Sequence, residues 1–402
     1  MTKEQILEKL QITALRDEWA ALCDEIYESY QQRIRELCNP GKLLELMETY
    51  GLFAEFRDEI LEGAMEIRQN EALALFVCML DKALACPDTY AGKETEFPFK
   101  NTPGYRFYPL IPMIHRLPEI VERYQVRNIP ETLIQETLQE FEVCLEIFRM
   151  HNGFTGFDSR FYGWMLNAMR GNLLRIGRFN FEVKNWNHPV KGFEHRDGRL
   201  MALADGASIH KSGQLLGSRF CEDVEGAVDA AVEETETAYT GYPADEMGRY
   251  QLNPVSLSKE EWRLRLSPGD AVISVHIPRD GALNKEICDA SYEEAWKIIR
   301  AAYPEYDFKA IVCNSWMLEK KLALYLKPTS NILAFQARFC PFATKAPGLA
   351  VFSFVYQFPN GTVRETIDYQ ALQPASSLQK IVKDIYLNGG AIYENGGFFF
   401  MD

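Results

Sequence analysis

The chain has 402 residues, of which 47% are hydrophobic and 25% are charged, and it carries a formal net charge of −14. This length predicts two or three domains, and the composition is that of a globular protein with a sizeable core. An acidic chain lacks the basic surface that displaces counterions from a polyanion, which argues against a general role in nucleic-acid binding.

No apolar run in the sequence approaches the roughly 18 residues that a membrane-spanning helix needs. The first residues read as the start of a helix rather than as a signal peptide, so we expect a cytoplasmic protein with no membrane partner. The nine cysteines are scattered without a Cys-x-x-Cys pair, which favours reduced, buried thiols. No histidine has a spacing to carboxylates that indicates a metal site, and we expect none.

Residues 1–153 are predicted to form an all-helical N-terminal domain. A long helical segment runs from about Leu15 to Cys38, and a polar loop covers Thr89 to Tyr105. The segment from Ala72 to Ala85 is apolar all round, as expected of a central buried helix. Before Gly153, leucine and aromatic residues repeat every three or four positions, which predicts a last helix that ends there.

Residues 154–402 are predicted to form a mixed α/β domain. Phe179 to Val183 begins the strand-like sequence, and residues 199–204 and 207–210 read as two strands or as a hairpin around an Asp-Gly turn. The acidic stretch 222–236 has helical propensity. Residues 239–258 contain several glycines and prolines and are expected to form a long connection.

The following segment predicts a strand, a helix and a second strand. Ala271–Ile277 and Phe308–Val312 are short apolar runs, and a capping box of Ser291 and Glu294 marks the start of a helix between them. A strand-helix-strand unit of this length implies a right-handed crossover between parallel strands.

The end of the chain is predicted to close this sheet. Ile332–Phe339 and Leu349–Phe358 look like two further strands, and Leu378–Tyr386 looks like a late helix. Two successive long strands suggest antiparallel pairing, so the predicted sheet is mixed.

Three short motifs carry a resemblance to a known family. They are Gly269-Asp270 with Val275-His276-Ile277-Pro278, Cys313-Asn314-Ser315-Trp316, and Ser330-Asn331-Ile332. On these motifs the chain resembles, over nearly its full length, a bacterial acyltransferase-like family with a helical N-acyltransferase N-terminal domain and a GNAT-like C-terminal domain. The resemblance implies an α+β protein in which the C-terminal domain has a central splayed sheet.

The resemblance also implies a site for acetyl-CoA or another acyl-CoA. In the GNAT fold two parallel strands separate, the pantetheine pairs with the backbone of the first strand, and the diphosphate lies at the following helix. These strands would be Ala271–Ile277 and Phe308–Val312, with the backbone of the first left open to the thioester. The expected cofactor-binding residues are Arg279, Gly281, Lys285 and Ser291.

This loop departs from the family pattern in two ways. The GNAT signature of Arg or Gln followed by x-x-Gly-x-Gly or Ala is absent, and Gly281 is the one glycine in the loop. Glu293 and Glu294 fall in the first turn of the predicted helix, where they would repel a diphosphate. Both departures favour a protein that does not use the cofactor.

Four residues are candidates for catalysis. Amine acylation needs a base, for which His276 in the first strand is the candidate, with a structural histidine as the alternative. Tyr325 lies in an Ala-Leu-Tyr-Leu-Lys stretch similar to one in which GNAT enzymes place their acid, so the resemblance implies that role. Cys313 with His276 suggests a thioester route instead, whereas Ser315 either takes part in the reaction or caps the next helix.

Two functions remain open from the sequence. The first is an acyl-CoA-dependent N-acyltransferase that acts on a small amine or a peptide amine, and His276 and the stretch around Tyr325 favour it. The second is a non-catalytic GNAT-derived protein that binds a ligand or a partner, which the missing loop signature favours. A thiol-dependent hydrolase is a third, more distant reading. We expect the first.

Overall fold

The computed structural model describes residues 2–10, 22–23, 25–88, 101–359 and 362–401. The chain divides into two compact units, Met1–Arg175 and Ile176–Asp402, and each is described by itself.

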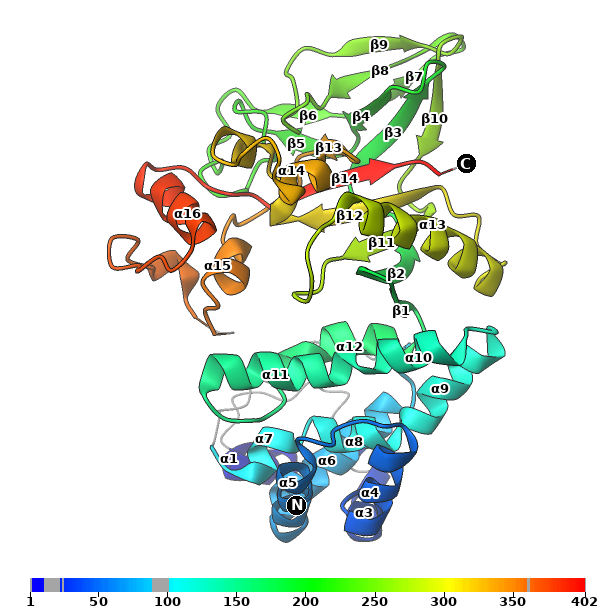
Figure 1. Cartoon of the computed structure of the whole chain (residues 1–402), viewed down its shortest axis with the longest axis vertical. Helices are drawn as coiled ribbons and strands as arrows, with labels where there is room; N and C mark the ends of the chain where they lie inside the picture. Colours follow the sequence, from blue (N-terminus) through cyan, green and yellow to red (C-terminus); the bar gives the residue numbers. More distant parts are fainter. Residues whose placement is uncertain (1, 11–21, 24, 89–100, 360–361, 402) are drawn as a thin grey trace. The chain divides into compact units, whose positions relative to one another are not determined.

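Every described element of the first unit before the strand at Leu173 is a helix (Figure 1). Part of the segment from Leu15 to Cys38 lies outside the described residues, as does most of the predicted loop Thr89–Tyr105. The helices are α1 (Lys3–Leu10), α3 (Tyr30–Leu37), α4 (Pro40–Thr49), α5 (Arg57–Gln69), α6 (Glu71–Leu84), α7 (Pro103–Phe107), α8 (Leu110–His115), α9 (Leu117–Val126), α10 (Glu131–Leu138), α11 (Glu140–Asn152), the 3-10 helix η1 (Ser159–Phe161) and α12 (Tyr162–Met169).

Helix α6 is the centre of this unit, as its apolar sequence predicts. Every residue from Ala72 to Asp81 is buried, and α6 packs against α3, α5 and α8. The side chain of Asn70 accepts a hydrogen bond from the Leu73 amide and begins the helix. A helix that is apolar on all sides can be accommodated only when neighbours cover all of them.

The boundary between the units lies later than Gly153, where the sequence analysis places it. The Tyr162 hydroxyl in α12 donates a hydrogen bond of 2.7 Å to the carbonyl of Pro109, and the Tyr124 hydroxyl donates one of 2.6 Å to the carbonyl of Leu173. These bonds tie α12 to the helical unit, so the division falls after Arg175.

The second unit contains two six-stranded sheets and a small two-stranded one. The first sheet has the order β1-β2-β11-β12-β14-β13, and the second has the path β10-β3-β4-β8-β7 with β9 on β8. The strands are β1 (Leu173–Ile176), β2 (Phe179–Asn185), β3 (Val190–His195), β4 (Leu200–Ala204), β5 (Ala207–Ile209), β6 (Val228–Ala230), β7 (Glu233–Glu234), β8 (Ala238–Pro243), β9 (Val255–Ser258), β10 (Trp262–Leu266), β11 (Ala271–His276), β12 (Ala310–Ser315), β13 (Cys340–Phe342) and β14 (Asn395–Phe399).

Helices cover one face of the first sheet and the second sheet packs on the other. Figure 1 shows α13 in front of β11 and β12, with the second sheet beyond them. The core between the sheets includes Trp186, Val190, Ala202, Val272, Val312, Phe342 and Phe398. The helical elements are α13 (Lys285–Ala302), η2 (Trp316–Leu318), η3 (Lys320–Leu324), α14 (Asn331–Gln336), α15 (Ala350–Val355), η4 (Arg364–Thr366) and α16 (Ser377–Leu387).

The predicted strand-helix-strand unit and the mixed sheet are confirmed. Strands β11 and β12 are parallel and are joined through α13, while β2 and β14 flank them in antiparallel orientation. Because side chains alternate along a strand, Val272 and Ser274 point to the second sheet, whereas Ile273 and Val275 point to α13.

The two strands predicted near the end of the chain are wrong, because Ile332–Phe339 and Leu349–Phe358 contain helices α14 and α15. Ser330 caps α14 by accepting from the Ile332 amide, and short apolar runs fit either structure. The sheet is closed instead by β13 and β14.

The closing strand β14 contains two adjacent glycines, which are depleted in strands, and it has no counterpart among the predicted elements. The glycine at 396 is required by packing, because a Cβ there would lie 2.0 Å from Cζ of Phe342. The sequence of β14 alone does not predict a strand, because its glycine makes room for the ring of Phe342, a residue distant in the sequence.

Residues 199–210 contain two strands, β4 and β5, as predicted, but β5 pairs with β6 and not with β4, so they do not form a hairpin. Two other predictions in the second unit are wrong. The stretch 222–236 forms β6 and β7 rather than a helix, and the predicted connection 239–258 contains β8 and β9. Pairing with distant strands overrides helical propensity here.

Candidate active site

The parallel pairing of β11 and β12 stops before either strand ends. It runs from Val272–Ala310 to Val275–Cys313, whereas β11 continues to His276 and β12 to Ser315. The expectation that the whole of Ala271–Ile277 is open is therefore wrong, and the separation is confined to its end. Pro278 follows directly, and because proline has no N–H it cannot extend the ladder.

His276 lies at this end of β11 and binds a carboxylate. Its Nε2 is 2.8 Å from Oε2 of Glu182 on the neighbouring strand β2, with 35% of the imidazole and 13% of the carboxylate exposed. Ser274 is paired with Glu182 in the antiparallel register, so Glu182 and His276 share one face of the sheet. The half-buried pair remains in reach of solvent.

The electrostatics of Glu182 favour its charged form. Burial by itself raises the pKa of this carboxyl, but the hydrogen bond with His276 and the charge of Lys184 outweigh burial, so the pKa lies below its ordinary value. The carboxylate therefore accepts a hydrogen bond from Nε2 and holds the imidazole in the tautomer with its lone pair on Nδ1.

Glu182 was missed by the sequence analysis, although one signal pointed to it. Asn180, Glu182 and Lys184 alternate with Phe181 and Val183 along β2, which marks one polar face of a strand with an apolar other face. The register that brings this face to His276 depends on a pairing across more than ninety residues, and the local pattern cannot supply it.

Cys313 does not form the nucleophilic pair with His276 that the sequence suggests. Val275 and Cys313 are register partners and point to the same face, so the side chain of His276 points to the opposite one. Burial raises the pKa of the Cys313 thiol to about 12, which leaves it protonated at neutral pH. Both observations disfavour a thioester route through this cysteine.

Ser315 acts as a cap, which was the alternative reading of this residue. Its hydroxyl accepts a hydrogen bond of 3.1 Å from the Met317 amide and starts η2. Ser315 has the same orientation as Cys313, two positions earlier on β12, and thus faces away from His276. The structure supports the cap, and a catalytic role for Ser315 stays a prediction.

Tyr325 is accessible and follows the 3-10 helix η3. Its side chain is 48% exposed, and its amide donates to the carbonyl of Leu322. No hydrogen bond joins Tyr325 to His276 within the part of the chain that the structure describes. Its role as an acid stays a prediction.

Helix α13 begins earlier than predicted, which changes the expected cofactor loop. Asn284 caps it by accepting from the amides of Glu286 and Ile287, so Ser291 lies in its second turn. Ser291 is 2% exposed and its hydroxyl donates to the carbonyl of Ile287, which disfavours a direct contact with a cofactor. The first turn of α13 therefore holds Glu286 in place of Glu293 and Glu294, so the electrostatic objection now applies to Glu286.

The other residues of the expected cofactor loop are accessible. Arg279 and Gly281 are exposed in the loop between β11 and α13, and Gly281 has a φ of +79°. Lys285 is the first residue of α13, and its ammonium is 2.6 Å from Oδ2 of Asp289. Arg178, on the turn before β2, donates a hydrogen bond to the carbonyl of Gly281 in this loop.

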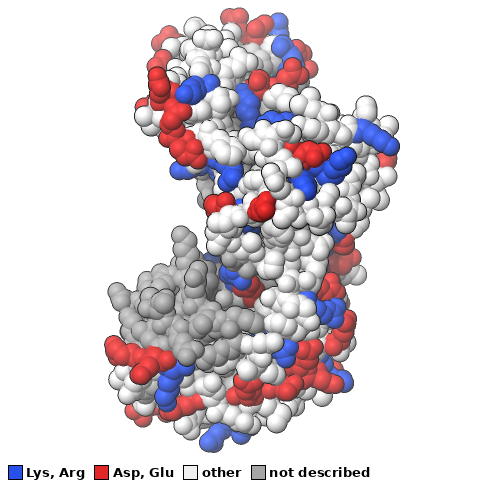
Figure 2. Space-filling model, turned by 90° about the vertical axis from the view of Figure 1, so that its left-hand side faces the viewer, with Lys and Arg blue, Asp and Glu red and all other residues white. Residues whose placement is uncertain are grey.

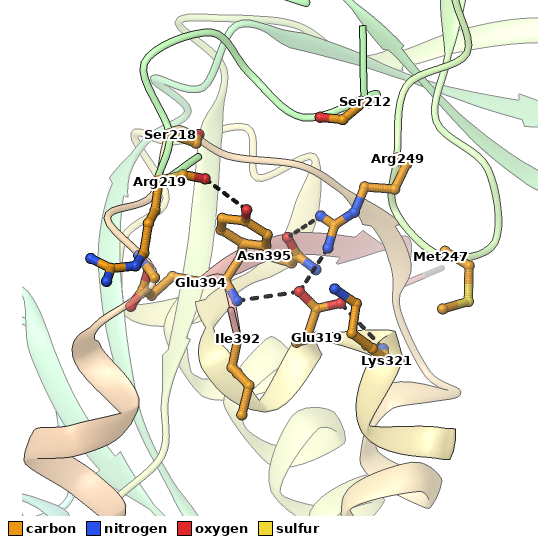
Figure 3. Close-up of polar contacts among 12 residues, drawn as sticks. Ser212, Ser218, Arg219, Met247, Arg249, Glu319, Lys321, Ile392, Glu394 and Asn395 are labelled. Atoms are coloured by element: carbon orange, nitrogen blue, oxygen red, sulfur yellow. Dashed lines mark hydrogen bonds and ion pairs between the residues drawn. The ribbon is translucent and has the colours of Figure 1, made fainter. Parts of the chain in front are cut away.

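A buried ion pair fixes the segment that carries Tyr325 (Figure 3). Nη2 of Arg249 is 2.7 Å from Oε2 of Glu319, whose side chain is 1% exposed. Glu319 also accepts from the backbone amides of Lys321 and Tyr393, at 3.2 Å each. Glu319 joins η2 to η3, so this network holds the chain beyond β12 against the turn that carries Arg249.

Two other histidine–carboxylate pairs are described in the second unit, His195 with Asp197 and His210 with Asp223, and neither lies where the pairing of β11 with β12 ends. On the face shown in Figure 2, basic and acidic side chains are interspersed without a continuous basic band over the described residues. A hollow of about 410 Å³ in the helical unit includes Asp81 in its lining, but this carboxylate is already paired with Arg33 and Arg116. No three potential metal ligands cluster among the described residues, and none of the helices described there could cross a bilayer.

Comparisons with known proteins agree with this architecture. The model of the GNAT-like C-terminal domain matches residues 173–399, and that of the N-acyltransferase N-terminal domain matches residues 41–171. No curated protein matches the chain.

Solved structures of acyltransferases share the fold. A mutant acyltransferase in complex with octanoyl-CoA is 16% identical with a TM-score of 0.65, and one in complex with decanoyl-CoA and teicoplanin is 17% identical with a TM-score of 0.64. An acyltransferase in complex with CoA and 10C-teicoplanin is 16% identical with a TM-score of 0.64. Each comparison covers 100% of both chains. At such low identity the likeness establishes the fold alone.

The fold and the two matched domains define an acyltransferase-like class of two-domain proteins. The chain belongs to the family with a GNAT-like C-terminal domain, preceded by an N-acyltransferase N-terminal domain.

Proposed function

We propose that this protein is an acyl-CoA-dependent N-acyltransferase, which transfers an acyl group from a CoA thioester to an amine. One observation carries the proposal: the pairing of β11 with β12 ends beside an accessible histidine that is hydrogen-bonded to a carboxylate. Membership of the family supports the reaction class, and the geometry supports the placement of its chemistry.

The residues around this end of the sheet fit acyl-CoA, which supplies the activated acyl group as a thioester. Beyond Val275 the edge of β11 is no longer paired with β12, and a pantetheine arm is proposed to add there in the manner of an added strand. The loop that follows leads to the N-terminus of α13, where backbone N–H groups and the helix dipole favour a diphosphate. Arg279 and Lys285 add positive charge there.

His276 acts as the base in this proposal. Glu182 holds its Nε2–H, so the lone pair of Nδ1 takes the proton from the attacking amine. The charge that develops on the imidazole is stabilised by the carboxylate. Tyr325 is proposed to return a proton to the departing thiolate, which its exposure permits.

The acceptor is proposed to be an amine of a small molecule or of a peptide. Two of the similar structures contain teicoplanin or 10C-teicoplanin, which makes a peptide-like acceptor a reasonable first choice. Octanoyl-CoA and decanoyl-CoA are found in two of them, so medium-length chains belong in any panel beside acetyl-CoA.

For the domain organisation we propose an all-helical N-terminal domain that ends at β1 rather than at Gly153. The helices described before Leu173 and the bonds that tie α12 to them support this boundary.

The proposal is tested by titrating the protein with acetyl-, octanoyl- and decanoyl-CoA in a calorimeter and by following thiol release with a panel of amines. Binding of at least one of them is expected, with a stabilisation of about 2.7 kcal/mol at a concentration 100 times Kd. His276→Gln should bind equally well but lose about 10²- to 10⁴-fold in kcat. Failure of every acyl-CoA to bind at millimolar concentration, or binding without turnover on any amine, would overturn it.

A further inference from the structure

The loop between β11 and α13 is hydrogen-bonded to one buried guanidinium, that of Arg178. Arg178 is only 7% exposed, and it donates hydrogen bonds to three carbonyls of this connection. Its Nη2 is 3.0 Å from the carbonyl oxygen of Pro278 and 2.9 Å from that of Gly281, and its Nε is 3.1 Å from that of Ala282. A planar cation with fixed donor directions thus sets the course of the loop.

Arg178 is itself locked against α13. Its backbone amide donates a hydrogen bond of 2.8 Å to the hydroxyl of Ser291, in the second turn of the helix. The preceding residue is Gly177, with a φ of +57°, and a Cβ at this position would lie 2.4 Å from that hydroxyl oxygen. Only glycine lets the turn approach this closely, so turn, loop and helix are held as one assembly.

The hydrogen bonds from Arg178 to the three carbonyls also fix the directions of the N–H groups in the loop. In a planar trans peptide the N–H is directed opposite to the C=O, so the N–H groups of Arg279, Ala282 and Leu283 point away from the guanidinium. Within the described part of the chain, the amides of Ala282 and Leu283 have no hydrogen-bond acceptor. Two successive N–H groups directed to the same side, each without an acceptor among the described residues, can together bind an anion.

We propose that Arg178 is a positioning residue for the CoA diphosphate: by holding the three carbonyls it presents the loop amides to the anion without touching it. The inference rests on the proposed use of acyl-CoA and extends it to a residue outside the loop. It also accounts for a loop without the Gly-x-Gly signature, since a side chain here takes over the task of orienting the backbone.

The test compares two probes that differ in the diphosphate. Arg178→Met and the wild type are titrated calorimetrically with CoA and with D-pantetheine, which has the thiol arm but no diphosphate. Arg178→Met is expected to lose about tenfold or more in affinity for CoA and nothing for D-pantetheine. Arg178→Lys keeps the positive charge but lacks the planar guanidinium with its fixed donor directions. Its affinity for CoA should lie between those of Arg178→Met and the wild type. Arg263→Met, at a 73% exposed side chain in the second sheet, serves as the matched control.

The outcomes separate this inference from the proposed function. A wild type that binds neither probe contradicts both, whereas equal CoA affinity in the wild type and Arg178→Met contradicts the positioning role alone. Equal losses of affinity for CoA and for D-pantetheine in Arg178→Met would show that Arg178 supports the structure in general and does not position the diphosphate loop. Should Arg178→Met fail to fold, hydrogen exchange in the wild type decides: residues 278–284 must be protected by CoA and not by D-pantetheine.

Discussion

Two carboxylates of the second unit, Glu319 and Glu182, each hold a basic side chain at hydrogen-bond distance in very different surroundings. Glu319 is 1% exposed and accepts from Arg249 and two backbone amides, whereas Glu182 is 13% exposed and binds a histidine that is 35% exposed. In the first arrangement the carboxylate accepts from three donors and holds a segment of the chain in place. The second retains access to solvent and a group that can exchange a proton. Burial thus separates a structural pair from a pair fit for chemistry.

The largest effect is expected where the buried pair is broken. Arg249→Met leaves the Glu319 carboxylate unpaired in the interior, which should lower the free energy of unfolding by about 3 kcal/mol in urea denaturation. The double variant Arg249→Met with Glu319→Gln should recover part of this loss, because the uncompensated charge is gone. A cost within 1 kcal/mol would place this pair with ordinary surface ion pairs.

The accessible pair should affect the reaction more than the fold. Glu182→Gln is expected to lower kcat about 10- to 100-fold, because the base loses the partner that orients it, while KM for acyl-CoA stays the same. A rise in KM with unchanged kcat would instead assign Glu182 to substrate binding.

The stability change of the same variant should depend on pH in one direction. The pKa of Glu182 is lowered in the folded state, so its contribution is present above the ordinary value of 4.5 and is lost as the pH falls through the folded pKa. The difference in unfolding free energy between wild type and Glu182→Gln should therefore be larger at pH 7 than at pH 4.

His188 adds a third kind of surroundings to the comparison, because aromatic rings rather than a carboxylate surround this histidine. It packs on Trp186 and Phe342, and burial, with a smaller effect of Lys184, lowers its pKa to about 4. The unfolded chain binds a proton here below pH 6.5, so the folded state should lose stability between pH 6.5 and 4. His188→Gln should remove up to about 2 kcal/mol of this acid-dependent loss, measured by urea denaturation at both pH values.

The smallest effect is expected at the buried thiol. Cys313→Ala removes one sulfur atom from the core and should cost about 1 kcal/mol or less, with kcat unchanged. Loss of turnover in a well-folded Cys313→Ala protein would support the thioester route that the orientation of β12 disfavours.

The sequence predicted the scaffold of the site better than the site itself. Strands β11 and β12 and their helical crossover follow from apolar runs and a helical period, which are local properties. His276 is identifiable because it interrupts such a run. Glu182 and Arg178 reach their partners only through the register of β2 on β11, which joins residues about ninety positions apart and leaves no local trace.

The errors near the end of the chain have the same origin. Helices α14 and α15 and strand β14 are chosen by packing, as the ring of Phe342 over Gly396 shows, and short apolar segments accept either conformation. The start of α13 was misplaced because two capping residues compete in the sequence, and Asn284 rather than Ser291 is the one that caps.

The position of β14 has a consequence for biosynthesis. Residues 395–399 are inserted between β12 and β13, although they are translated more than eighty residues after β12. Until they leave the ribosome, β12 has an unpaired edge that can recruit strands from other nascent chains. Because this inner strand is synthesised last, we expect chaperones to bind the chain during synthesis. We also expect fragments that stop before Asn395 to aggregate.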